Sequence, residues 1–311
     1  MAFLRAFGSW LPSRRMTNAE LAPLLEVTPE WILEVSGIAE RRYAEADHTV
    51  ANIGILAAKD CLEKAGVAAA DLGMILVASG SSDRFCPGPA SQIAAGLGLA
   101  TTAALDIPVA SAGSLIGLIL AARLAPNLGR VLVVGSEIMS RRITLSPETK
   151  NTAILFGDGA GAALVDAETG FARIVDYCLY TDGNSAEILT VLDGSFFMDG
   201  QAVIMHASRK MPRAIQELLT RNQIEASQVE AFLLHHANLN LILRVANALK
   251  APKERFFANI ARYGNTSSAS LLIAADEWHQ SQSAPLTGPL VFSAFGAGLN
   301  WGAVLALPAM K

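Results

Sequence analysis

The sequence has little charge and no long apolar run, and each shortage excludes a class of protein. Charged residues make up only 17% of the 311 positions, and the formal net charge is -4. A basic surface for nucleic acid or anionic lipid is therefore not expected. No apolar run reaches the roughly 18 residues that a membrane-spanning helix needs. We expect neither a nucleic-acid partner nor a membrane protein.

Cysteine is also scarce, with only Cys61, Cys86 and Cys178. Three widely spaced cysteines do not form a disulfide framework, and the first residues, Met1 to Arg5, lack the apolar core of a signal peptide. We therefore expect a cytoplasmic protein in a reducing compartment. No cysteines, histidines or carboxylates stand at metal-ligand spacing, so we expect no metal site.

What the sequence does contain is apolar residues, at 52% of positions, which indicates a globular protein with a large core. In the first half, short apolar runs alternate with helical patterns, which favours an α/β fold. The runs at 74–78, 103–110 and 131–134 are apolar throughout, as in strands buried on both faces. Helices are predicted at 49–65, 90–97 and 111–124, the last ending before Pro126, and Thr17 with Glu20 predicts a capping box.

The second half shows the same alternation from Phe171 onward. Strands are predicted at 231–235, 290–294 and 301–307, and helices at 211–221, 239–249 and 269–279. No low-complexity linker separates the halves, so we expect residues 1–170 and 171–311 to share a core. The glycines of 156–162 precede an apolar strand and not a helix, which favours a strand–turn–strand link over a phosphate loop.

A candidate nucleophile lies where an apolar strand meets an apolar helix, in Asp106-Ile107-Pro108-Val109-Ala110-Ser111-Ala112-Gly113. Ser111 is predicted at the positive end of the helix dipole, among backbone N–H groups that can hold an oxyanion. The commoner role of a serine there is a helix N-cap, and this segment alone favours the cap. The segment is not a Gly-x-Ser-x-Gly elbow, because Val109 replaces the first glycine.

Two further segments carry groups that complement a nucleophile. Leu233-Leu234-His235-His236-Ala237-Asn238 ends a strand with two histidines that point to opposite faces, so they are poor ligands for one metal. Gly264-Asn265-Thr266-Ser267-Ser268-Ala269-Ser270 is a turn before a helix. A structural histidine and a turn-capping Asn are the commoner readings in isolation. Together with Ser111, however, an imidazole and an amide can move a proton and stabilise an oxyanion.

With these segments in view, the chain resembles the β-ketoacyl-ACP synthase III family of the thiolase-like superfamily. The resemblance covers nearly the whole length. It rests on Pro29-Glu30-Trp31-Ile32, on Ser36-Gly37-Ile38-Ala39-Glu40-Arg41, on Phe156-Gly157-Asp158-Gly159-Ala160-Gly161-Ala162, on Gly264-Asn265-Thr266-Ser267 and on the glycine-rich Phe295 to Gly302. His235-His236-Ala237-Asn238 looks like the family's His-Gln-Ala-Asn.

The resemblance implies a thiolase-like αβαβα five-layered sandwich of two similar halves, and a homodimer. It implies that residue 111 takes an acyl group from coenzyme A or acyl carrier protein (ACP), with the coenzyme A thioester as substrate and no other cofactor. The acyl group then condenses with malonyl-ACP. The implied site residues are His235 and Asn265 at the malonyl carbonyl, the backbone N–H groups of Ser111 and Ala297 as oxyanion hole, Trp31, Lys150, Asn238 and Phe295 at the substrate or coenzyme A, and Cys86, Met139, Phe156 and Leu189 around the acyl chain.

The main departure from the family is Ser111, which stands in place of the nucleophilic cysteine. A thiol has a pKa near ~8.5 and a free hydroxyl several units higher, so Ser111 needs His235 as a general base. Three explanations of Ser111 are open. It is a natural nucleophile, or an engineered replacement of cysteine that traps a complex, or the protein has lost self-acylation and only binds acyl carriers or decarboxylates. We favour the natural serine, because other positions diverge too.

Those other positions concern substrate entry. Lys150 and Asn240 replace family arginines or other basic residues, and Cys86 before Pro87 replaces a phenylalanine that reaches into the partner's acyl pocket. We therefore predict an acyltransferase for fatty-acid-like or polyketide initiation. The alternatives are acyl transfer to an alcohol, an amine or water, and a catalytically weak synthase that binds acyl carriers.

Overall fold

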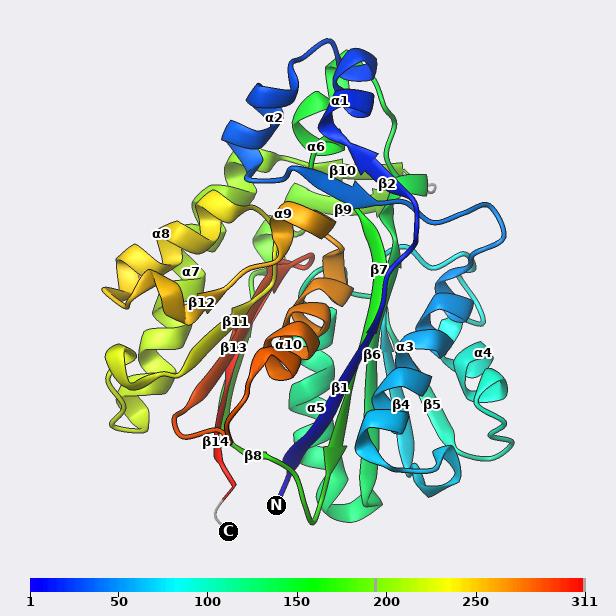
Figure 1. Ribbon diagram of the computed structural model, residues 1–311, viewed down its shortest axis with the longest axis vertical. Coiled ribbons are helices and arrows are strands. Elements are labelled where there is room, and N and C mark those ends of the chain that lie inside the picture. Colours follow the sequence, from blue (N-terminus) through cyan, green and yellow to red (C-terminus); the bar gives the residue numbers. More distant parts are fainter. Residues whose placement is uncertain (193–194, 310–311) are drawn as a thin grey trace.

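The computed structural model describes residues 1–192 and 195–309 and builds them around one ten-stranded sheet (Figure 1). The strand order is β12-β11-β13-β14-β8-β1-β7-β6-β4-β5. The first-half strands are β1 (Phe3–Trp10), β4 (Met74–Ala78), β5 (Ala103–Ile107), β6 (Arg130–Ile138) and β7 (Asp158–Asp166). The second-half strands are β8 (Ala172–Thr181), β11 (Ala231–Leu234), β12 (Phe256–Phe257), β13 (Leu290–Gly296) and β14 (Asn300–Pro308).

The sheet consists of two five-stranded units with the same topology. When the five strands of a unit are numbered in chain order, they lie side by side in the order 3-2-4-5-1 in both units. Both units combine two parallel pairs with two antiparallel pairs. In the described residues, strands β1 and β8 join the two units within the sheet through Phe3↔Arg173 and Leu4↔Ala172. The topology repeats although the sequence shows no short repeat.

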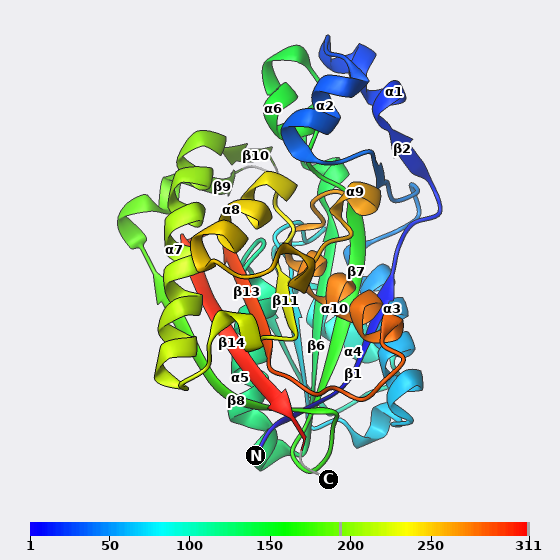
Figure 2. The same cartoon turned by 60° about the vertical axis from the view of Figure 1, so that its left-hand side comes forward.

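Helices cover both faces of each unit and create five layers (Figures 1 and 2). Helices α3 (Val50–Ala65) and α4 (Pro89–Gly96) cover the outer face of the first unit, and α7 (Gly200–Arg221) and α8 (Leu239–Leu249) that of the second. Helices α5 (Gly113–Leu128) and α10 (Ser270–Ser281) lie between the units, in an apolar core that takes side chains from both. The central helices therefore bring segments from both halves together.

Small elements gather at the end of the molecule away from the two termini (Figure 2). They include α1 (Asn18–Leu21), α2 (Pro29–Ser36), α6 (Lys150–Ala153), α9 (Ile260–Tyr263), and two antiparallel strand pairs, β2 (Arg15–Thr17) with β3 (Glu40–Arg42) and β9 (Leu189–Leu192) with β10 (Ser195–Met198). The predicted capping box between Thr17 and Glu20 is confirmed. Across residues 1–192 and 195–309, every helix is too short or too polar to cross a membrane.

Three local predictions from the first half are wrong. Helix α5 continues through Pro126 to Leu128, because the proline lies in the last turn and Gly129 caps the end through its N–H to Ala125 O at 2.8 Å. Strand β5 is not buried on both faces: it is an edge strand, and Leu105 is 54% exposed. The glycines of 156–162 form no turn but enter β7, where a Cβ on Gly161 would lie 2.7 Å from Leu272 Cβ of α10.

Helix α7 is longer than predicted. It begins at Gly200, and the Asp199 carboxylate accepts the Ala202 N–H at 3.0 Å as its N-cap. The first turns carry exposed Ile204 and Met205 and buried Val203, which breaks the apolar periodicity that the prediction depends on. The extension matters for function, because Val203, Ala207 and Met211 wall the cavity described next.

Candidate active site

Ser111, His235 and Asn265 line one small cavity although they come from three distant segments. The cavity has a volume of about 20 Å³. Its other walls are apolar and come mainly from the second half: Phe156, Leu189, Phe196, Met198, Val203, Ala207, Met211, Ala237, Leu241 and Phe295. A hydroxyl, an imidazole and a carboxamide therefore face a common space with mainly apolar walls, as the sequence predicted.

Ser111 lies in a strained turn and not at the helix cap. Strand β5 ends at Ile107 and α5 begins at Gly113 with Ala112 as its N-cap, so the N-cap interpretation of Ser111 is wrong. Its φ is +67°, a left-handed conformation that is uncommon for a residue with a side chain. Its N–H donates to Ser267 Oγ at 3.0 Å. Strain held in place by such contacts is typical of functional positions, including the nucleophile elbow that the local sequence does not match.

His235 follows β11 directly and is held by two contacts. Its backbone N–H donates to Ser293 O at 2.8 Å, and its ring Nδ1 lies 2.6 Å from Ser270 Oγ. Burial, helped by the neighbouring His236, lowers the pKa of His235 to about 3. The imidazole is therefore neutral near neutral pH. His236 faces elsewhere, with Nε2 3.2 Å from Phe257 O.

Asn265 is fixed at both its backbone and its side chain. Its N–H donates to Leu155 O at 2.8 Å, and its carbonyl accepts the Gly157 N–H at 3.1 Å. The side-chain Oδ1 accepts the Ser267 N–H at 2.9 Å. Because the oxygen is engaged, the amide NH2 is the part of Asn265 that can donate to a ligand in the cavity.

The two backbone groups implied for an oxyanion hole are already hydrogen-bonded. The Ser111 N–H donates to Ser267 Oγ, and the Ala297 N–H donates to Ala110 O at 3.2 Å. An acyl oxygen has to share or displace these partners. Among the described residues, the Ser111 hydroxyl makes no direct hydrogen bond to His235 or Asn265, so the three side chains share the cavity without contacting one another through hydrogen bonds.

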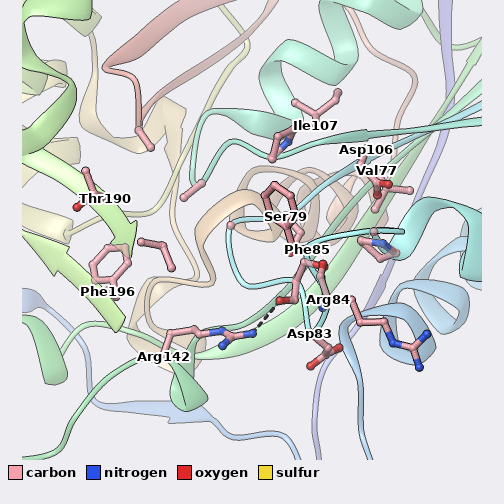
Figure 3. A pocket seen from close by; sticks show the side chains of 18 of the residues that line it. Val77, Ser79, Asp83, Arg84, Phe85, Asp106, Ile107, Arg142, Thr190 and Phe196 are labelled. Atoms are coloured by element: carbon pink, nitrogen blue, oxygen red, sulfur yellow. Dashed lines mark hydrogen bonds between the residues drawn. The ribbon is translucent and has the colours of Figure 1, made fainter. Parts of the chain in front are cut away.

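A second, larger cavity of about 940 Å³ borders the small one. Figure 3 shows Thr190 and Phe196 on one side of it and Asp106 and Ile107 on the other. Leu189 and Phe196 line both cavities, so these two side chains form the wall between them. Phe196 packs edge-on against Phe156, with ring centroids 4.9 Å apart.

The remaining predicted residues divide into two groups. Phe156, Leu189 and Phe295 line the small cavity. Asn238 instead caps α8 through Oδ1 and donates to Val35 O at 3.0 Å, and Met139 is fully buried at the start of a short 3₁₀ turn. Neither residue lines either of these two cavities, and their predicted roles at the substrate and the acyl chain stay predictions. Exposed Cys86 lines neither cavity of its own chain; its predicted place in a partner's pocket stays a prediction.

Trp31 and Lys150 lie close together in the group of small elements. The Lys150 Nζ is 6.0 Å from the centre of the Trp31 ring, at the outer limit of a cation–π contact. Both side chains are half-buried. They present an aromatic face and a positive charge side by side, which suits the adenine and phosphates of a nucleotide-like ligand.

Sequence reasoning missed the residues that hold the reacting groups in place. Ser267 and Ser270 contact Ser111, Asn265 and His235, and the fully buried Glu137 accepts the Ser268 N–H at 3.2 Å. The signal was present as the run Ser267-Ser268-Ala269-Ser270, which is unusually rich in hydroxyls for the start of a buried helix. In the described ranges no three His, Cys, Asp or Glu side chains gather to hold a metal ion.

Comparison with known proteins identifies the family. Residues 105–183 match the model for 3-oxoacyl-[acyl-carrier-protein] synthase III, and residues 219–307 match its C-terminal model. The β-ketoacyl-[acyl-carrier-protein] synthase III of Oleidesulfovibrio alaskensis is 36% identical, with 98% of each chain covered. The chain belongs to the β-ketoacyl-ACP synthase III family.

Solved structures of synthase III proteins agree with this assignment. The Aquifex aeolicus 3-oxoacyl-ACP synthase III superposes with a TM-score of 0.94 at 31% identity, covering 99% of this chain and 100% of that one. The priming β-ketosynthase of the R1128 polyketide pathway superposes with a TM-score of 0.89 at 30% identity, covering 100% and 97%. The predicted thiolase-like fold is confirmed, and the chain is a condensing acyltransferase of the synthase III type.

Proposed function

We propose that the protein takes an acyl group from acyl-CoA or acyl-ACP onto Ser111 and condenses it with malonyl-ACP. The observation that carries this proposal is the single cavity in which Ser111, His235 and Asn265 meet. The names of its relatives give a β-ketoacyl-[acyl-carrier-protein] as product, and the acyl-CoA, acyl-ACP and malonyl-ACP substrates are what the family resemblance implies for this chain. The product is a β-ketoacyl-ACP that starts a fatty-acid-like or polyketide chain.

The first half-reaction is acyl transfer to the serine. Ser111 Oγ attacks the thioester carbonyl, and His235 takes the hydroxyl proton as the bond forms. The tetrahedral intermediate breaks its C–S bond, and the thiol leaves with that proton. The apolar walls exclude water, which strengthens each hydrogen bond to the developing oxyanion.

The second half-reaction forms the carbon–carbon bond. Malonyl-ACP loses CO2, and the resulting enolate oxygen accepts a hydrogen bond from the Asn265 amide. The enolate carbon attacks the acyl-serine carbonyl, and the C–O bond to Ser111 breaks. The serine oxygen takes up a proton from solvent, which balances the reaction.

Ser111 in place of cysteine changes both steps. A neutral hydroxyl needs a base, and neutral His235 offers a lone pair, but the burial that lowers its pKa to about 3 also makes it a weak base. The acyl-serine is an oxoester, which a carbon nucleophile attacks less readily than a thioester. The same intermediate is open to an alcohol, an amine or water, and these acceptors are the alternative outcomes of the experiment below.

We also propose a cytoplasmic homodimer that docks ACP and binds coenzyme A at Trp31 and Lys150. The dimer is supported by the edge strand β5, which in the described part of the chain pairs with β4 alone and exposes Leu105, and by the fully exposed Phe85 beside it. An uncovered strand edge next to an exposed aromatic ring favours association. Sedimentation of the purified chain tests this assignment.

Mass spectrometry of the intact protein after incubation with acyl-CoA tests the function. We expect an acyl adduct on Ser111 that disappears when malonyl-ACP is added and β-ketoacyl-ACP forms. If only ester, amide or free acid is released, the reaction is acyl transfer to an alcohol, an amine or water, and the proposed condensation is wrong. No adduct, together with full activity of Ser111→Ala, would refute a serine nucleophile.

A further inference from the structure

Ser270 occupies a position in which its hydroxyl contacts three groups at once. The Ser270 Oγ lies 2.6 Å from His235 Nδ1, 3.1 Å from the His236 backbone N and 2.9 Å from the Ser267 carbonyl oxygen. All of these groups are buried. The serine begins α10, the central helix of the second half, so its position is fixed by the core.

Counting protons decides which way each hydrogen bond runs. The His236 N–H can only donate and the Ser267 carbonyl can only accept. The single hydroxyl proton of Ser270 therefore points to Ser267 O, because two oxygens 2.9 Å apart without a proton between them repel each other. The remaining contact, to His235, then requires that Nδ1 carries a hydrogen and donates it to Oγ.

We propose that Ser270 is a positioning residue that holds neutral His235 as the Nδ1–H tautomer, with the unprotonated Nε2 available to the cavity. The alternative tautomer would draw the hydroxyl proton to Nδ1 and leave the Ser270–Ser267 contact without a hydrogen. In the Nδ1–H form every close contact of Oγ is a hydrogen bond. The catalytic consequence rests on the proposed function; the tautomer itself does not.

The tautomer assigns different roles to the two polar groups of the cavity. An Nε2 lone pair accepts a proton and cannot donate, so His235 is the base for the Ser111 hydroxyl. Asn265 is held the opposite way, because the Ser267 N–H occupies its Oδ1 and leaves the NH2 to donate. Segment 265–270 thus fixes one acceptor and one donor, and the enolate hydrogen bond falls to Asn265 alone.

Nitrogen NMR of the ligand-free protein tests the tautomer directly. The full chain is labelled with 15N histidine, and the His235 signals are assigned by comparison with His235→Asn. We expect a neutral ring with hydrogen on Nδ1 and none on Nε2 at pH 7. A ring with hydrogen on Nε2, or a doubly protonated ring, overturns the proposal whether or not the protein acylates.

Substitution of Ser270 tests whether the contact matters to the reaction. In Ser270→Ala we expect the His235 signals to shift toward a mixture of tautomers. Acylation of Ser111 should slow by about 10- to 100-fold, part of the roughly 10²–10⁴ that a positioned base contributes. Ser270→Thr keeps the hydroxyl and should restore both the tautomer and most of the rate. An unchanged tautomer in a folded Ser270→Ala would overturn the positioning role.

A matched control comes from the same helix. Ser281 Oγ donates to Trp278 O at 2.6 Å at the far end of α10, so Ser281→Ala removes a serine–backbone hydrogen bond away from the site. It should alter neither the tautomer nor the rate. The two proposals fail separately: an Nδ1–H ring without an acyl adduct defeats only the function, and an adduct with an Nε2–H ring defeats only this inference.

Discussion

The two halves have the same strand topology but differ in what they place at the ends of equivalent strands. Each half has a serine with positive φ just before its central helix: Ser111, at +67°, before α5, and Ser267, at +47°, before α10. The two serines touch, because the Ser111 N–H donates to Ser267 Oγ. Only Ser111 lines the cavity, whereas Ser267 is fully buried and supports its counterpart.

A second pair of equivalent positions carries different side-chain chemistry in the two halves. Ser79 follows β4 as His235 follows β11, and Glu137 of β6 corresponds in register to Phe295 of β13. In the first half the Glu137 carboxylate accepts hydrogen bonds from Ser79 Oγ, Gly80 N–H, Ser81 Oγ and Ser268 N–H, and Ser79 and Gly80 also line the larger cavity. In the second half His235 and Phe295 line the small cavity together with Ser111 and Asn265. The repeat supplies two frameworks, and the side chains at equivalent positions make one a buried carboxylate network and the other a wall of the small cavity.

The largest expected effect separates the two serines. Ser111→Ala removes the nucleophile and should lower condensation by at least about 10³-fold. Ser267→Ala removes only an acceptor for the Ser111 N–H and should lower the rate by about fivefold, since a neutral hydrogen bond contributes roughly 1 kcal/mol. The measurement is the initial rate of β-ketoacyl-ACP formation. Equal losses in the two variants would show that the halves share the chemistry.

Ser111→Cys extends that comparison. A thiolate forms near neutral pH without a base, so the cysteine variant depends less on His235 than the natural chain does. If the serine is native to this active site, Ser111→Cys lowers the rate. A strong gain in condensation would instead indicate that the site is adapted to a thiol.

The next largest effect is on stability and lies in the first half. Glu137→Leu leaves four buried donors without an acceptor and should lower the free energy of unfolding by about 3–5 kcal/mol. The counterpart Phe295→Leu loses only apolar contacts and should cost about 1–2 kcal/mol. Urea unfolding of both variants measures the difference. Similar costs would contradict a carboxylate that organises this part of the first half.

A smaller effect is expected on the pH dependence of the free energy of unfolding, and it differs between the two halves. The unfolded chain protonates His235 below its ordinary pKa of 6.5, but the folded chain does so only near a pKa of about 3, because of burial. The unfolded state therefore binds more protons between these values, and stability is lost as the pH falls. Between pH 7 and pH 5 this loss is about 2 kcal/mol. His235→Asn should remove that part of the pH dependence, as followed by urea unfolding, whereas Ser79→Ala should retain it.

The sequence alone predicted the parts of the fold that depend on local apolar pattern. Strands β4, β11, β13 and β14 and helices α3 and α8 lie within a few residues of their predicted bounds, because each is a compact apolar segment with clear ends. The three residues that meet in the small cavity were predicted from motifs. The turn at Ser111 and the proton placement at His235 depend on contacts 156 and 35 residues away in sequence, and no local pattern encodes them.

The smallest expected effect compares two lysine–tryptophan pairs, one in each half. Lys150 lies over Trp31 at 6.0 Å in the first half, and Lys210 lies over Trp301 at 4.1 Å in the second, where it also pairs with Asp182 at 2.6 Å. Lys150→Met should raise KM for acyl-CoA by about 2- to 5-fold with kcat unchanged, since such a contact contributes about 0.5–1 kcal/mol. Lys210→Met should leave KM unchanged, because its shorter and better paired contact holds α7 to the sheet. The weaker Lys150–Trp31 contact is the better candidate for the coenzyme, because a strong contact within the protein does not by itself mark a binding site. If Lys210→Met raises KM and Lys150→Met does not, the coenzyme binds to the second half and this prediction is wrong.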